Sequence, residues 1–80
     1  MAKPIIFGRH ARHQIALYKL SLDAVEAVVR QPIIRRPSMH GRGREDCYGS
    51  HPAFKWVRVV ILEEPDRIVV ITAHPRRHGP

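Results

Sequence analysis

Two cations, a hydroxyl and an imidazole lie close together in the C-terminal third of the chain. Lys55 and Arg58 belong to one segment rich in β-branched residues, and Thr72 and His74 end the next one. Cleavage of RNA by its own 2′-OH needs a base for that hydroxyl, a cation on the phosphate and an acid for the leaving oxygen. These groups would be enough to cleave RNA without a metal ion or other cofactor. The alternative interpretation is structural: Thr72 would be an ordinary strand residue, His74 a half-exposed strand end, and Lys55 or Arg58 a solvated edge. Thr72 and His74 are the catalytic candidates, and Lys55 and Arg58 are the candidate phosphate ligands.

A second group of polar candidates lies near the N-terminus, in a segment with helical spacing of its apolar residues. These candidates are Arg9, His10, Arg12 and His13. His10 would be a second catalytic proton carrier, and the other three would bind phosphate. His10 and His13 are three residues apart and could instead be half of a zinc site, which Cys47, His40 or His51 would have to complete. A simple solvated helix surface is a third interpretation of the same residues.

The charge balance favours an anionic partner. The 80 residues carry 14 Lys and Arg against 7 Asp and Glu, a formal charge of +7. Most of the surplus is arginine, whose planar guanidinium suits bidentate contact with phosphate. Arg76 and Arg77 are further candidate phosphate ligands, and they extend this charge into a polar tail over residues 75–80, which we expect to be flexible. RNA is therefore the expected partner, with a non-catalytic module that binds nucleic acid or protein as the alternative.

The sequence lacks the motifs of several other classes of enzyme. It has no phosphate-binding glycine loop, no serine-centred elbow and no paired carboxylates, which argues against nucleotide, ester and glycoside hydrolysis. A single cysteine, Cys47, cannot form an internal disulfide, and no apolar run is long enough for a signal peptide or a membrane span. We expect one cytoplasmic domain over residues 1–80, without membrane association.

The elements that must position the candidates are two helices followed by four strands. Residues 9–19 predict the first helix. Ser21 predicts the N-cap of a second helix that ends before Pro32. Short strands are expected over 33–36 and 45–49, followed by a hairpin whose long strands are 55–62 and 67–73. The predicted fold is α+β, with both helices on one face of a four-stranded, mainly antiparallel sheet (ααββββ) and the other face uncovered.

The pairing register of the hairpin is left open by the sequence. One loop length places Val57 opposite Thr72 and Lys55 opposite His74, while another places Arg58 opposite Thr72. The register therefore decides whether Lys55 or Arg58 joins the hydroxyl and the imidazole.

The order of these signals resembles the RelE/ParE superfamily of small bacterial toxins, in particular its BrnT-like branch and related uncharacterised domains. The resemblance lies in a first helix with the motif His-x-x-x-[Arg/Gln], here His10 to Gln14, a second helix of the form Ser-x-x-x-Val-x-x-Val-Val-x-x-Pro, and a last strand reading Val-Val-Ile-Thr-Ala-His-Pro-Arg-Arg. It covers about residues 7–77. Many relatives carry Arg where this chain has Gln14 and Leu17.

This resemblance implies a toxin-type endoribonuclease that acts without a metal ion and is neutralised by a small acidic antitoxin protein. His10 matches the histidine of the first helix, Thr72 the hydroxyl of the last strand, and Arg76 or Arg77 its basic end. ParE-like members of the superfamily poison gyrase instead of cleaving RNA, and other members are inactive relatives.

Overall fold

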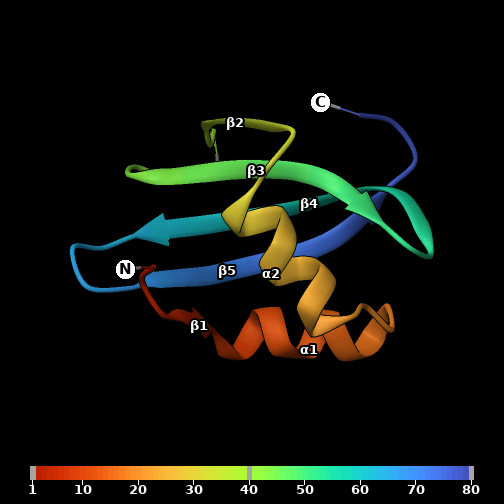
Figure 1. The fold of residues 1–80 in the computed structure, drawn as a ribbon, viewed down its shortest axis with the longest axis horizontal. Helices are drawn as coiled ribbons and strands as arrows, with labels where there is room; N and C mark the ends of the chain where they lie inside the picture. Colours follow the sequence, from red (N-terminus) through yellow and green to blue (C-terminus); the bar gives the residue numbers. More distant parts are fainter. Residues whose placement is uncertain (1, 40, 80) are drawn as a thin grey trace.

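The computed structural model describes residues 2–39 and 41–79. Within them two helices pack against a five-stranded mixed sheet, which confirms the α+β class (Figure 1). The elements, in chain order, are β1 (Ile5–Phe7), α1 (Arg9–Leu17), α2 (Leu22–Arg30), β2 (Ile34–Pro37), β3 (Arg44–His51), β4 (Phe54–Glu63) and β5 (Ile68–Arg76). Met1, His40 and Pro80 lie outside the described residues, so His40 as a metal ligand and the end of the predicted tail are not tested.

The strand β1 is the main correction to the predicted fold. Ile5–Phe7 pairs in parallel with β5, in the register Ile6 to Val69, so the strand order is β1-β5-β4-β3-β2 and the sheet is mixed. A run of three residues is too short to show the alternation that identifies a strand in a sequence. Pairing satisfies backbone groups at the edge of β5 that would otherwise be open.

The two helices form the expected corner (Figure 1). Ser21 caps α2 as predicted, because its side-chain oxygen accepts a hydrogen bond from the Ala24 N–H at 3.3 Å. The connection from α1 turns through Lys19, whose φ of 55° lies in the left-handed region. The helix α1 accordingly ends at Leu17, two residues before its predicted end.

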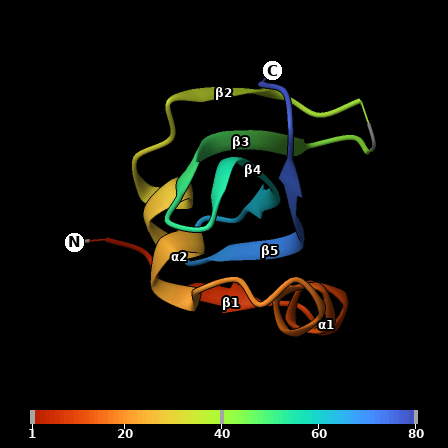
Figure 2. The same cartoon turned by 90° about the vertical axis from the view of Figure 1, so that its right-hand side faces the viewer.

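The hydrophobic core lies between α2 and one face of the sheet (Figure 2). Alternate residues of the strands point into it, as the period of two requires. The fully buried members are Ala11, Val25, Cys47, Val57, Val59, Ile61, Val70 and Ala73. Gly49 allows α2 to approach β3 closely, since a Cβ atom there would lie 2.8 Å from Val28 Cγ2.

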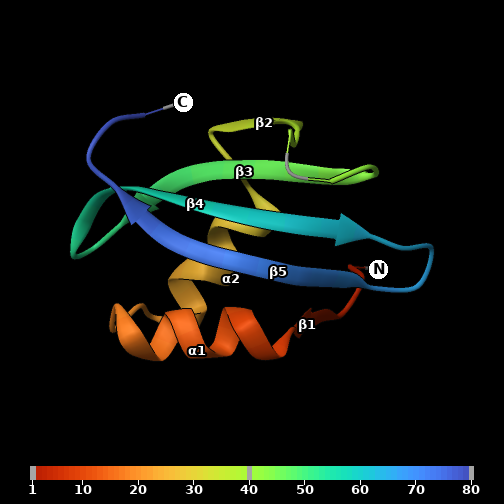
Figure 3. The same ribbon diagram turned by 180° about the vertical axis from the view of Figure 1, so that it is seen from behind.

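The helix α1 lies along β5 rather than over the centre of the sheet (Figure 3). Ala11 and Ile15 on this helix are buried in the core. Gln14, on another side of α1, accepts a hydrogen bond from the Ala73 N–H through its Oε1 at 2.9 Å. The side chain of Gln14 therefore pairs a backbone donor of β5 beyond the end of β1.

A network of charged side chains closes one end of the sheet on the α2 side. Arg35 donates to Glu45 and to Glu63, and Lys3 pairs with Glu63 at 2.7 Å. Hydrogen bonds from Lys3 and then Arg35 lower the pKa of Glu63 to about 2, and the Arg35 guanidinium lowers the pKa of Glu45. This network ties the N-terminal segment to β2, β3 and β4.

No helix among the described residues has the length and apolar character that a membrane span requires.

Candidate nucleic-acid interface

The face of the sheet opposite α2 carries the residues that could bind a phosphate. We call it the open face. Cross-strand pairing brings Tyr48, Arg58 and His74 into one row across β3, β4 and β5. Asp46, Val60 and Thr72 form the next row.

Neither register considered for the hairpin is right. The strand β4 runs on to Glu63, which pairs with Ile68, and a β-bulge leaves Ile71 as an extra residue in β5. Together these two features place Arg58 directly opposite His74 and next to Thr72 in the neighbouring row. The cation that joins the hydroxyl and the imidazole is therefore Arg58, and not Lys55.

Arg58, Thr72 and His74 border one hollow of the open face. We call it the β5 hollow; it has a volume of about 280 Å³ and is lined by Gln14, Arg44, Arg58, Val60, Thr72 and His74. Arg44 comes from the start of β3 and Gln14 from α1, so the hollow lies where three elements meet. It holds two guanidinium groups and an imidazole and no carboxylate, and this arrangement suits an anion.

Arg58 forms an ion pair in the floor of the open face. One of its terminal nitrogens lies 3.4 Å from Asp46 Oδ1, and the two side chains are only 11% and 8% exposed. The Nε atom of Arg58 is buried and makes no hydrogen bond within the described part of the chain. The guanidinium is thus held in a fixed position with part of its hydrogen-bonding capacity unused.

A second hollow borders the first and shares Arg58 with it. We call it the Tyr48 hollow; its volume is about 440 Å³ and its lining includes Arg36, Met39, Asp46, Tyr48, Arg58 and Arg76. The guanidinium carbons of Arg36 and Arg76 lie 5.2 and 5.8 Å from the centroid of the Tyr48 ring. Arg36 also donates to the Tyr48 hydroxyl at 3.3 Å. Arginines from β2 and β5 therefore converge over one buried ring, which orients them by cation–π attraction.

Acidic residues are nearly absent from the two hollows. Asp46 is the only carboxylate among their lining residues, and six further acidic residues lie elsewhere in the chain. Of these, Glu45, Glu63 and Glu64 are paired with Arg35, Lys3 or Arg67. The four arginines and the single aspartate that line the two hollows therefore give the open face a net positive charge.

The open face is partly enclosed by its own side chains. Tyr48, Val60 and Asp46 are 2%, 3% and 6% exposed, although no helix covers them. The chain after β5 rises towards the β2 side of the sheet (Figures 1 and 2), and Gly79 lies against the Trp56 ring. The expected uncovered sheet is thus a grooved surface, with arginines along its walls.

The other predicted site residues lie outside these hollows. Arg9, His10 and His13 are exposed on α1, and His10 is one helical turn before Gln14. Lys55 is exposed near the start of β4, and Arg77 is exposed beyond the end of β5.

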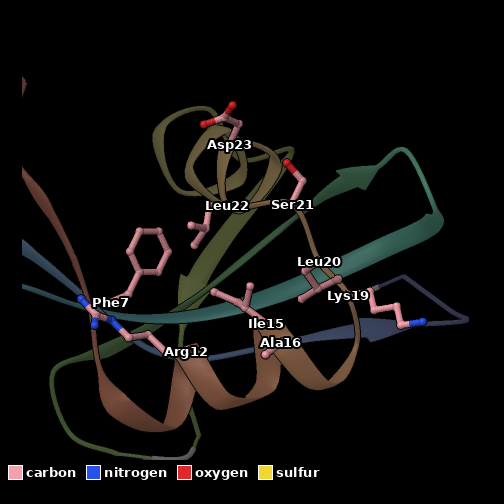
Figure 4. Close-up of a pocket in the computed structure, with 9 residues that line it drawn as sticks. All are labelled: Phe7, Arg12, Ile15, Ala16, Lys19, Leu20, Ser21, Leu22 and Asp23. Atoms are coloured by element: carbon pink, nitrogen blue, oxygen red, sulfur yellow. The ribbon is translucent and has the colours of Figure 1, made fainter.

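Arg12 lines a different depression, between α1 and the start of α2 (Figure 4). This depression has a volume of about 800 Å³, and Phe7, Ile15, Leu20 and Leu22 make its apolar floor. The first-helix cluster is therefore divided, with Arg12 on the side of α2 and His10 on the same side of α1 as Gln14.

Several residues of the open face were not predicted from the sequence. They are Gln14, Arg36, Asp46 and Tyr48. The alternation of strands β2 and β3 could have placed Arg36, Asp46 and Tyr48 on one face, once their pairing was known. Gln14 was marked only as a position where relatives of the resembled family carry Arg, and its contact with β5 depends on where α1 lies.

The described residues contain no group of three or more His, Cys, Asp or Glu side chains arranged to hold a metal ion. Burial raises the pKa of the Cys47 thiol to about 11, so the thiol remains protonated at neutral pH and is a poor nucleophile.

The fold and the two hollows define a small α+β protein with a cationic groove across an open sheet face. Comparisons with models of protein families, with curated proteins and with solved structures gave no match to this chain.

Proposed function

We propose that this protein is a toxin-type endoribonuclease that cleaves single-stranded RNA by attack of the 2′-OH, without a metal ion. The observation that carries the proposal is the β5 hollow, where Arg58, Thr72 and His74 surround one space without a carboxylate among its lining residues. The RelE/ParE resemblance supports the same function through His10 and Thr72. A single strand is the fitting substrate, because the 2′-oxygen must reach a position in line with the leaving oxygen, which an A-form duplex does not allow.

In the proposed reaction the phosphate binds in the β5 hollow. Arg58 and Arg44 neutralise its charge, and the Thr72 hydroxyl donates a hydrogen bond to it. One imidazole takes the proton of the 2′-OH, the O2′–P bond forms, and the P–O5′ bond breaks. The 5′-oxygen then takes a proton from a second imidazole. His74 is one of these proton carriers; His10 is the other, on the side of α1 that borders the hollow.

The same proposal includes a regulator. A small acidic antitoxin protein would neutralise the open face, as the resemblance implies, and both proteins would meet RNA in the cytoplasm.

The test is cleavage of a short single-stranded RNA by the purified protein, with and without a chelator. We expect products that end in a 2′,3′-cyclic phosphate, and no cleavage of the matching 2′-O-methyl RNA. His74→Ala should lower the rate by roughly 10²- to 10⁴-fold. Thr72→Val, which keeps the shape of the side chain, should also lower it.

Arg30→Gln is the matched control, because Arg30 is an exposed cation on α2 whose partner is Glu26. It should cleave like the wild type. Cleavage that depends on a metal ion, or that persists in both His74→Ala and Thr72→Val, contradicts the proposal. RNA binding that weakens with salt but leads to no cleavage supports the non-catalytic module instead.

A further inference from the structure

We infer that the Tyr48 hollow holds a second phosphate, one nucleotide away from the phosphate in the β5 hollow, so that the substrate must carry two consecutive phosphates. This inference rests on the proposed use of the open face for RNA. It adds a binding site to which the proposed reaction assigns no role.

The residues of β5 that line the two hollows are about one nucleotide step apart. His74 and Arg76 are two residues apart on the same face of β5, a distance of about 6.6 Å along a strand. Successive phosphates of a single-stranded nucleic acid have a comparable spacing. Arg58 lines both hollows, so the two hollows adjoin each other.

The charge of the Tyr48 hollow also favours an anion. Three arginines line it against one carboxylate, and that carboxylate, Asp46, is already paired with Arg58. Arg36 and Arg76 have no carboxylate partner among the described residues. Their guanidinium groups converge on the Tyr48 ring, although like charges repel one another. A phosphate in the Tyr48 hollow would offset this positive charge and accept hydrogen bonds from the arginines that line it.

The arginines of this hollow are held in place before any ligand binds. Arg36 donates to the Tyr48 hydroxyl, and Tyr48 is only 2% exposed, so its ring is a rigid support. Fixed guanidinium groups lose little conformational entropy on binding. A phosphate in the Tyr48 hollow should therefore bind more tightly than one that meets a mobile surface cation.

The experiment measures binding of short 2′-O-methyl uridine oligomers, which contain no nucleophilic hydroxyl. A dimer, a trimer and a tetramer carry one, two and three internal phosphates. For the wild type at low salt we expect affinity to rise by roughly 10-fold from dimer to trimer, and by less than about 3-fold from trimer to tetramer. A trimer with either phosphate replaced by a neutral methylphosphonate should bind like the dimer.

Arg36→Gln and Arg76→Gln should remove most of the gain between dimer and trimer while leaving the affinity for the dimer within about 2-fold. Arg30→Gln, which removes the same charge from α2, should keep the full gain. Thermal melting of each variant checks that the fold is retained.

The outcomes separate this inference from the proposed function. An equal gain in affinity for each added phosphate overturns the second phosphate site, even where RNA is cleaved. So does an unchanged gain from dimer to trimer in both Arg36→Gln and Arg76→Gln. The predicted gain without any cleavage supports the site and contradicts the nuclease. No binding of any oligomer contradicts both.

Discussion

Asp46 is the one acidic residue of the cationic groove, and replacing it with Asn should lower stability and strengthen RNA binding at once. Its carboxylate lies 3.4 Å from a terminal nitrogen of Arg58, and both side chains are nearly buried. Two unit charges at that distance attract by about 5 kcal/mol at an effective dielectric constant of about 20. The neutral amide of Asn keeps an oxygen acceptor for Arg58 and avoids the desolvation cost of a buried carboxylate.

The net loss for Asp46→Asn should therefore be about 1 to 3 kcal/mol, smaller than the gross attraction. For a domain of this size about 2 kcal/mol lowers the melting temperature by roughly 10 °C, which a thermal melt followed by circular dichroism resolves. The same change removes the negative charge beside the proposed phosphate positions. Affinity for a 2′-O-methyl RNA should rise by roughly 5-fold at low salt, a gain of about 1 kcal/mol.

Glu45→Gln is the matched control for this prediction. Glu45 is the neighbouring residue on β3, but its carboxylate pairs with Arg35 on the α2 side of the sheet. The control removes the same charge from the other face of the sheet. It should leave RNA affinity nearly unchanged, because solvent and salt screen the interaction between Glu45 and RNA on the open face. Equal effects of the two substitutions on RNA affinity, or full stability of Asp46→Asn, would refute the reasoning.

Two further predictions concern the other face of the sheet. Gly49→Ala should lower the free energy of unfolding by about 1 to 3 kcal/mol, because the added Cβ would lie 2.8 Å from Val28 Cγ2 in a packed core; a denaturant titration that gives wild-type stability would contradict this close packing. Glu63→Gln should cost about 1 kcal/mol at neutral pH, since Lys3 and Arg35 both pair with this partly exposed carboxylate. Because the folded-state pKa of Glu63 is lowered from 4.5 to about 2, its contribution is complete above about pH 5 and is lost as the pH falls towards 2. The free energy of unfolding of the variant should therefore fall less steeply than that of the wild type as the pH falls from 5 to 2. Parallel curves of unfolding free energy against pH would count against the pairing of Glu63 with Lys3 and Arg35.

The class of the fold could be predicted from the sequence because its strongest signals are local. Ser21 before an amphipathic segment identifies α2, and the turn at Pro65-Asp66 identifies the hairpin. The strand β1 could not be predicted in this way, since three residues carry no period and its pairing with β5 joins distant parts of the chain.

The candidate site was predictable in its residue types but not in its arrangement. Thr72, His74 and Arg58 were identified as candidates, yet the register that unites them depends on one extra strand residue at Glu63 and on the bulge at Ile71. A shift of one residue moves a side chain to the other face of a sheet, so errors of this size decide which cation belongs to the site. Arg36 could not be recognised because its partner ring, Tyr48, lies twelve residues away on another strand.

The central claim is that RNA binds to the open face and not to the face that α2 covers. The most direct measurement is a titration of the ¹⁵N-labelled protein with a 2′-O-methyl RNA, followed by amide chemical shifts. We expect the largest shifts at Arg36, Arg58, Thr72, His74 and Arg76, with α2 nearly unaffected. Shifts centred on α2 or on the depression between α1 and α2, with the open face unchanged, would contradict the account.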